Sequence, residues 1–183
     1  GAFTVRSAGS WSPDGSRIAF DASPTTLIRD ERRDAYVADV MSKQVDAITT
    51  MHDVESTPQF SPDGRTLVYT INPHEWKPNK DGIMPRTIRN AHLVTYDIAS
   101  RTVTDHASAA FDVSAGQARW SPDGKHIWFS ASDRVYQSMY DYVLSTKTYT
   151  KLTTDVVVGG SSVSNDGSKM AFVFDTPNWP AEL

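Results

Sequence analysis

The chain has 183 residues and a mass of 20.2 kDa, the size of a single domain. Lys and Arg number 18 against 22 Asp and Glu, and this net charge of -4 argues against a nucleic-acid partner, because phosphate-binding domains carry a basic excess. A hydrophobic content of 39% supplies a core, and no apolar run reaches the ~18 to 20 residues of a membrane helix. Without cysteine there is no disulfide, thiolate nucleophile or Cys-bound zinc, and both a periplasmic and a cytoplasmic location stay open.

One short motif occurs four times along the chain. Ser-Pro-Asp-Gly follows Trp11, Phe60 and Trp120, and an apolar segment comes after each copy. The fourth copy, at 164–167, is Ser-Asn-Asp-Gly. The last residues of successive copies are 49, 60 and 43 positions apart. The shortest interval is close to the ~40 to 50 residues of a four-stranded propeller blade, and the longer ones indicate blades with insertions.

Each copy has the composition of a tight hairpin turn. Ser opens a type I turn, Pro fixes the backbone at the second position, and Gly takes the left-handed conformation after Asp. Asn165 replaces Pro in the fourth copy and keeps the turn chemistry. The residues expected to form these turns are Pro13, Asp14, Gly15, Pro62, Asp63, Gly64, Pro122, Asp123, Gly124, Asp166 and Gly167.

The segments between the turns predict further strands in chain order. Beyond the two strands that flank each turn, alternating apolar residues indicate strands at 34–40, 45–50, 91–98, 101–105, 140–144 and 148–153. The fourth unit supplies only two strands before the tail at 177–183, and residues 2–5 are expected to be the outer strand of a preceding blade. No segment has helical periodicity of useful length.

The predicted fold is therefore all-β, a partial β-propeller of about three and a half four-stranded antiparallel blades. A single propeller segment over 1–183 divides into approximate units at 8–50, 57–105, 117–154 and, incomplete, 161–183. A ring of only four blades is the alternative, but it lacks one strand. We therefore interpret the chain as a segment of a longer protein.

The repeat resembles that of two groups of propellers. Ser-Pro-Asp-Gly after Trp or Phe, followed by Ile-Ala-Phe at 18–20, is similar to the repeat of TolB-like propellers and of the N-terminal propeller of the prolyl-oligopeptidase family of serine peptidases. Phe-Asp-Thr-Pro-Asn-Trp-Pro-Ala-Glu-Leu at 174–183 resembles the peptidases, where such a stretch leads towards the hydrolase domain. The resemblance covers nearly the whole chain. It implies a dipeptidyl- or acylaminoacyl-peptidase, with a peptide substrate and an α/β-hydrolase domain of the same parent chain as partner.

No catalytic centre is expected within these residues. The family needs a Gly-x-Ser-x-Gly elbow, an Asp and a His, whereas Gly-Gly-Ser-Ser-Val at 159–163 lacks the closing Gly and is interpreted as a loop between blades. The five histidines (52, 74, 92, 106 and 126) are not at metal-ligand spacing, and calcium and phosphate loops are absent. We therefore expect neither metal nor cofactor, and a hydrolase domain that lies outside this chain.

The candidate substrate contacts lie in a long insertion. Antiparallel strands alternate direction, so the insertions at 22–33 and 71–90 should share the face opposite the Ser-Pro-Asp-Gly turns. The second insertion contains aromatic and cationic side chains that suit a carboxylate or a polypeptide. Those that we single out are His74, Trp76, Arg86 and Arg89. The alternative is a solvated, variable loop.

A charged run, a lone glutamate and the aromatic residues before the turns also bear on the function. Glu31-Arg32-Arg33-Asp34 fits either a charged clamp or a solvated edge. The dipeptidyl-peptidase-IV subgroup carries a Glu-Glu pair that holds the substrate amino terminus; here Glu55 stands alone, which favours an acylaminoacyl or broader oligopeptidase type. Trp11, Phe60 and Trp120 are expected to pack between blades.

The predicted function is to gate the access of short peptides to the hydrolase domain, and the alternative is a TolB-like periplasmic propeller that binds proteins.

Overall fold

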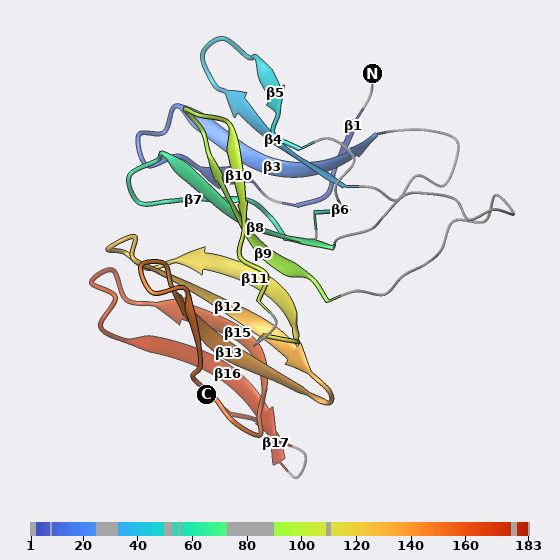
Figure 1. Ribbon diagram of the computed structural model, residues 1–183, viewed down its shortest axis with the longest axis vertical. Helices are drawn as coiled ribbons and strands as arrows, with labels where there is room; N and C mark the ends of the chain where they lie inside the picture. Colours follow the sequence, from blue (N-terminus) through green and yellow to red (C-terminus); the bar gives the residue numbers. More distant parts are fainter. Residues whose placement is uncertain are drawn as a thin grey trace, which may run out of the picture.

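The computed structural model describes residues 3–7, 9–24, 33–49, 53–54, 56–72, 90–108, 111–176 and 179–182. All regular structure in this part is β-strand, and the strands form antiparallel sheets stacked face to face in chain order (Figure 1). We call the sheets blades 1 to 4. The prediction of an all-β partial propeller is confirmed.

Blade 1 has its innermost strand in two pieces. Both β1 and β2 pair with β3, and β4 and β5 follow outwards as antiparallel neighbours. The bounds are β1 Phe3–Val5, β2 Ser10–Trp11, β3 Arg17–Pro24, β4 Asp34–Asp39 and β5 Val45–Ala47. The expectation that residues 2–5 form the outer strand of a preceding blade is wrong, because Val5 pairs with Ala22 of β3 inside blade 1.

Blade 2 repeats this arrangement. Its innermost strand is again divided, into β6 and β7, which both pair with β8. The outer strands β9 and β10 follow in order. The bounds are β6 Asp53–Val54, β7 Gln59–Phe60, β8 Thr66–Asn72, β9 His92–Asp97 and β10 Thr102–Asp105. The strands expected at 91–98 and 101–105 thus occur within one residue of their expected ends.

Blade 3 is the most regular of the four. Its innermost strand is continuous but shifts register between Ala115 and Ala118, and each later strand pairs with the one before it. The bounds are β11 Ser114–Trp120, β12 His126–Asp133, β13 Tyr136–Val143 and β14 Thr148–Lys151. The third strand therefore starts four residues earlier than the expected 140–144.

Blade 4 contains β15 Val157–Val163, β16 Met170–Thr176 and β17 Trp179–Glu182. Two expectations fail here. Residues 159–163 are part of the innermost strand β15 and not a loop between blades, and the tail adds a third strand that pairs antiparallel with β16. A single parallel pair, Gln137 with Val157, also links blade 4 to β13 of blade 3.

The core lies between the blades. One buried cluster joins Ala19 and Ala35 of blade 1 to blade 2 residues that include Leu67 and Tyr69. A second joins Val68 and Leu93 of blade 2 to nine-tenths-buried aromatic and aliphatic side chains of blade 3, namely Ala115, Ala118, Ile127, Phe129, Ala131, Tyr140 and Tyr142. Because side chains alternate along a strand, blade 2 buries one face on blade 1 and the other on blade 3.

Tyr69 is fully buried, and its hydroxyl has no hydrogen-bond partner in the described part of the chain. A buried hydroxyl without a partner costs desolvation energy that a phenyl ring avoids. We expect Tyr69→Phe to raise the free energy of unfolding by about 1 kcal/mol in urea titrations. The matched change Tyr142→Phe removes a hydroxyl that lies 2.9 Å from Nδ1 of His106, and it should lower the free energy by a similar amount. If Tyr69→Phe instead lowered the free energy of unfolding, the Tyr69 hydroxyl would have a hydrogen-bond partner in solution.

Candidate functional site

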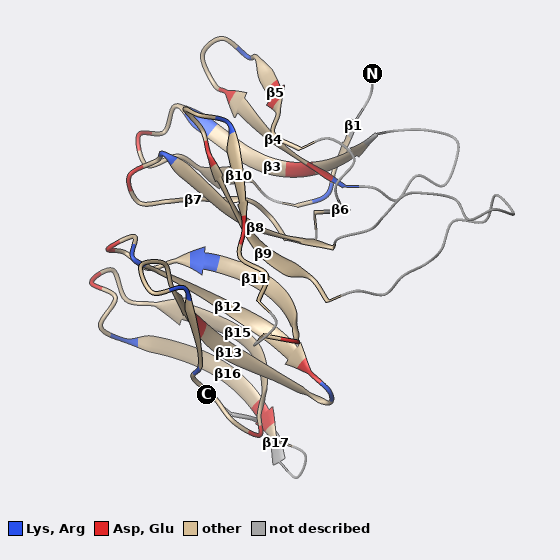
Figure 2. Ribbon diagram, in the orientation of Figure 1, with Lys and Arg blue, Asp and Glu red and all other residues tan. Residues whose placement is uncertain are grey.

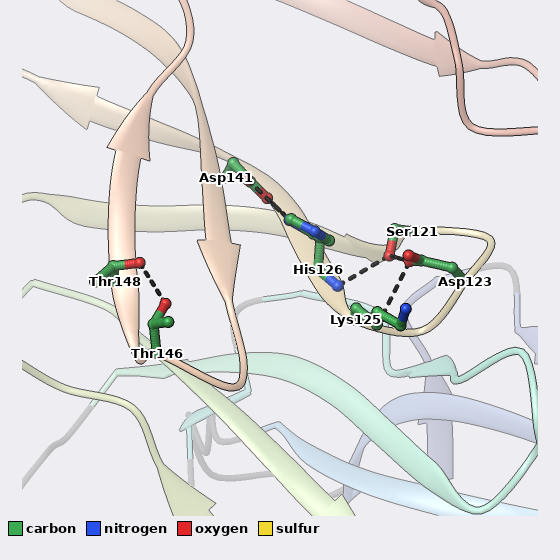
Figure 3. A network of polar contacts seen from close by, with 7 residues as sticks. All are labelled: Ser121, Asp123, Lys125, His126, Asp141, Thr146 and Thr148. Carbon is green, nitrogen blue, oxygen red and sulfur yellow. Dashed lines mark hydrogen bonds and ion pairs between the residues drawn. The ribbon is translucent and has the colours of Figure 1, made fainter.

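The repeated turns gather on one side of the blades, where β2 meets β3, β7 meets β8, β11 meets β12 and β15 meets β16 (Figure 1). In the third turn, Ser121 Oγ donates to Asp123 Oδ1 at 2.6 Å and accepts the backbone N–H of His126 at 2.9 Å (Figure 3). Gly124 N–H donates to the Ser121 carbonyl, and its φ of 68° is left-handed. The same serine bonds recur at Ser12, Ser61 and Ser164.

The turn aspartates are anionic structural groups. The Ser12 hydroxyl, followed by the Ser16 backbone N–H, lowers the pKa of Asp14 to about 2. The Ser164 hydroxyl does the same for Asp166, whose pKa is also about 2. Hydrogen bonds from serine also lower the pKa of Asp63 and Asp123. A carboxylate held in this way keeps its charge at neutral pH, so these groups cap turns and are poorly suited to act as general acids.

A serine, a histidine and an aspartate meet beside the third turn, but they do not form a catalytic triad. Nδ1 of His126 lies 2.9 Å from Oδ2 of Asp141, which is the orienting contact of a triad. The Ser121 hydroxyl donates to Asp123 and contacts only the backbone of His126 (Figure 3). The imidazole is therefore not placed to take the serine proton, and this group of residues cannot activate a nucleophile.

The turns also connect neighbouring blades. A Cβ added to Gly64 would lie 3.2 Å from Cδ of Pro13, and one added to Gly167 would lie 3.1 Å from Cδ of Pro122. Each turn proline thus packs on the glycine of the turn in the next blade. Arg17 strengthens the first junction, because its Nη2 donates to the Gly64 carbonyl at 3.1 Å. Gly15 is different, since nothing lies within 4 Å of its added Cβ.

The aromatic residues before the turns behave differently in different blades. Phe60 is 8% exposed, and Nε1 of Trp120 donates to the Gln59 carbonyl of the preceding blade at 3.1 Å, so both pack between blades. Trp11 is 58% exposed, and the expectation that it packs between blades is wrong for this structure. Ile18 and Phe20 on the same face are half-buried, although their counterparts in blades 2 and 3 are fully buried. Blade 1 therefore presents an uncovered apolar face.

A pocket of about 340 Å³ lies at the inner rim of the turn side. The turn prolines Pro13, Pro62 and Pro122 line it together with Gln117 and Arg119 of the innermost strand β11. Arg119 donates through Nη1 to the Ser161 carbonyl of blade 4 at 3.2 Å, and no carboxylate of the described residues pairs with it. Charges of both signs alternate at the turns around this rim (Figure 2). The rim suits a polar ligand with main-chain amides better than one of high charge.

The candidate contacts His74, Trp76, Arg86 and Arg89 lie outside the described residues, as do Glu31, Arg32 and Glu55. The strands that flank the two insertions can still be placed. The ends of β3 and β8 lie on the side of the blades opposite the turns (Figure 1). Their position agrees with the expectation that both insertions start on that side.

Arg33 has a defined partner. Its Nη1 lies 3.8 Å from Oδ2 of Asp21, a residue that is almost completely buried on β3. The Ser7 hydroxyl donates to the other oxygen of the same carboxylate. The guanidinium of Arg33, which is 45% exposed, therefore lies beside a buried carboxyl group, a contact that neither the clamp nor the solvated-edge interpretation of Glu31-Arg32-Arg33-Asp34 anticipated.

No three His, Cys, Asp or Glu side chains gather as metal ligands in the described ranges. No helix there has the length and apolarity needed to cross a bilayer.

Comparison with known proteins places the fold. No family model matches the chain. Dipeptidyl-peptidase 5 of Porphyromonas gingivalis is 28% identical over 141 residues, which are 75% of this chain and 19% of that peptidase. The crystal structure of TolB from Acinetobacter baumannii has a TM-score of 0.70 and 22% identity over 98% of this chain and 39% of that one. The putative TolB from Agrobacterium tumefaciens has a TM-score of 0.67 and 17% identity, and covers 93% of this chain and 55% of that one. The chain has the fold of a TolB-like propeller and spans about a fifth of the curated relative that it matches.

Proposed function

We propose that this chain is part of the non-catalytic propeller of a serine peptidase, and that the propeller admits short peptides to an α/β-hydrolase domain of the same protein. The observation that carries the proposal is the similarity to Dipeptidyl-peptidase 5, which extends over three quarters of the chain. The tail at 174–183, with its resemblance to the peptidase propellers, supports the same assignment.

The uncovered face of blade 1 supports a larger ring of blades. Trp11 is 58% exposed, and Ile18 and Phe20 are half-buried, whereas the counterparts of Ile18 and Phe20 in blades 2 and 3 are fully buried. Gly15 has the open space that a turn proline fills at Gly64 and Gly167. Contiguous exposed apolar faces usually mark interaction sites. A further blade would cover the apolar face of blade 1 and supply a proline beside Gly15.

In such a ring, the innermost strands surround a central passage. Gln117 and Arg119 point towards the inner-rim pocket from β11, beside the turn prolines. Side-chain amides and a guanidinium can exchange hydrogen bonds with the main chain of an extended peptide. Folded proteins are too wide for a passage of this kind, so the ring would select by size. We assign the insertion residues Trp76, Arg86 and Arg89, with His74, to contact with the same substrate on the opposite face.

The second candidate function is a TolB-like propeller that acts by binding proteins. Its support is the likeness to TolB, which covers nearly the whole chain. The two functions differ in whether a hydrolase belongs to the protein, so an activity measurement separates them.

The test compares this chain alone with the whole protein that contains it. We expect the 183 residues to release no product from dipeptidyl or N-acetyl-aminoacyl nitroanilides, because the one Ser-His-Asp group of the described residues is not a triad. The whole protein should hydrolyse at least one of these substrates and lose the activity after treatment with a serine-directed phosphonate. Phosphonate-sensitive hydrolysis by the chain alone, or none by the whole protein, would contradict the proposal. The second outcome would favour the protein-binding function.

A further inference from the structure

One histidine bridges blades 2 and 3. His106 follows β10 of blade 2, and its Nε2 lies 2.8 Å from Oγ1 of Thr95 in the same blade. Its Nδ1 lies 2.9 Å from the hydroxyl of Tyr142 on β13, and its carbonyl accepts the hydroxyl of Tyr149 on β14 at 2.6 Å. The imidazole also packs against the Tyr142 ring, with 5.0 Å between the ring centroids. His106 of blade 2 thus contacts two strands of blade 3, β13 through its side chain and β14 through its backbone carbonyl.

The surroundings of His106 favour the neutral imidazole. Burial among the tyrosines lowers its pKa, and the charge of Lys147 on blade 3 acts in the same direction. The charge of Asp105 raises the pKa of His106, but its effect is smaller than that of burial. The Asp105 carboxylate also lies 3.4 Å from Nδ1 of His92. Tyr142 and Tyr149 are themselves held in the neutral form, because burial raises the pKa of both hydroxyls. The charged groups around the bridge therefore do not offset the cost of a buried imidazolium.

At the end of the same junction that lies away from the turns, two buried hydroxyl groups lack hydrogen-bond partners among the described residues. Thr70 lies two residues after Val68 on β8, and Ser138 lies two residues before Tyr140 on β13, so both share a face with the core between blades 2 and 3. Both are fully buried, and neither hydroxyl has a hydrogen-bond partner among the described residues. Each costs free energy while the junction is closed and would be hydrated if it opened.

We propose that the junction between blades 2 and 3 is an acid-sensitive seam, which neutral His106 holds closed and protonated His106 loosens. Opening would extend a groove that already exists there. This groove of about 630 Å³ runs along the turn side of the junction, between Thr95 and Thr104 of blade 2 and Trp120 and Leu144 of blade 3. At low pH the widened groove would form a lateral entrance to the propeller, beside the central passage. The contacts of the seam all lie within blades 2 and 3, so the proposal holds whether or not the protein contains a hydrolase domain.

The sign of the pH effect follows from the lowered pKa. Imidazole in an open junction titrates near its ordinary value of about 6.5, so the open form binds the proton more readily than the closed form. The stabilisation by His106 is complete above that pH and is lost as the pH falls below it. Asp14 and Asp166 keep their charge throughout this range, since the pKa of each is about 2. Loss of the turn carboxylates therefore does not mimic the effect.

Hydrogen exchange with mass spectrometry at pH 7.5 and pH 5.0, corrected for intrinsic rates, tests the seam. We expect amides of β9, β10, β13 and β14 to exchange about tenfold faster at pH 5.0, while those of β3 and β4 stay unchanged. His106→Gln, which keeps a neutral donor and acceptor, should abolish the difference. The matched control His126→Gln alters a histidine that pairs with Asp141 and should retain it.

Two results would overturn the seam. One is equal protection of blades 2 and 3 at both pH values in the unaltered chain, and the other is an unchanged pH effect in His106→Gln. If that variant does not fold, proton NMR of the unaltered chain still decides. The imidazole of His106 should titrate below 6.5 together with the ring signals of Tyr142, and titration at or above 6.5 would contradict the proposal.

Discussion

Replacing Phe129 with alanine should lower the free energy of unfolding by about 3 to 5 kcal/mol, the range for large aromatic side chains in a core. Phe129 is fully buried on β12 and lies in the cluster between blades 2 and 3. Its ring packs edge-on against Phe111 at 5.5 Å and stacks with Tyr140 at 5.7 Å between centroids. Truncation would leave a cavity that two stacked sheets can close only in part.

The control is the same change in blade 1. Phe20 holds the position of Phe129 after its own turn but is only half-buried, and its ring stacks on Tyr36 with 5.6 Å between centroids. Phe20→Ala should therefore cost about 1 kcal/mol in urea unfolding of this chain. Equal losses for the two variants would contradict the conclusion that the face of blade 1 is uncovered.

Gly64→Ala should lower the free energy of unfolding by about 2 to 4 kcal/mol, more than the same change at Gly15. Both glycines have φ near 70°, where a Cβ costs about 1 to 2 kcal/mol. At Gly64 the new methyl also presses on Pro13, and such overpacking adds about 1 to 2 kcal/mol. Gly15→Ala carries only the backbone strain, since its surroundings are open.

A double-mutant cycle isolates the contact between the turns. Pro13→Ala removes the ring that meets the new methyl, so it should restore part of the stability lost in Gly64→Ala. The same proline change should leave the cost of Gly15→Ala nearly unchanged. If the effects of Pro13→Ala and Gly64→Ala simply add, the turns of blades 1 and 2 do not press on each other in solution.

The sequence predicted the repeat architecture well, because each Ser-Pro-Asp-Gly turn depends on local chemistry alone. All four glycines of the motif have a left-handed φ. The strands beside them followed from alternation over a few residues. The ends of the chain were predicted less well. Val5 pairs inside blade 1 with Ala22, 17 residues away, and such non-local pairing leaves no local signal. The tail pairs with the adjacent strand β16, although its two prolines, Pro177 and Pro180, argued against a strand.

Side-chain contacts were the other part of the structure that the sequence did not predict. Trp11 and Trp120 both precede a Ser-Pro-Asp-Gly turn, but Trp120 is half-buried and bonds to the preceding blade, whereas Trp11 is 58% exposed. His106 carried no motif, since its partners Thr95 and Tyr142 lie 11 and 36 residues away. Arg33 belonged to a charged run that suggested a surface, yet it pairs with a buried carboxylate on the neighbouring strand. Side-chain partners of this kind become visible only after the sheets have stacked.

We propose that these residues belong to the propeller of a serine peptidase. The most direct measurement is to purify the native protein with an antibody against this chain, label it with a fluorophosphonate and map the label by peptide mass spectrometry. We predict one labelled serine, in a Gly-x-Ser-x-Gly peptide of the same polypeptide but outside the 183 residues. A native protein that takes up no label and contains no such peptide would contradict the claim.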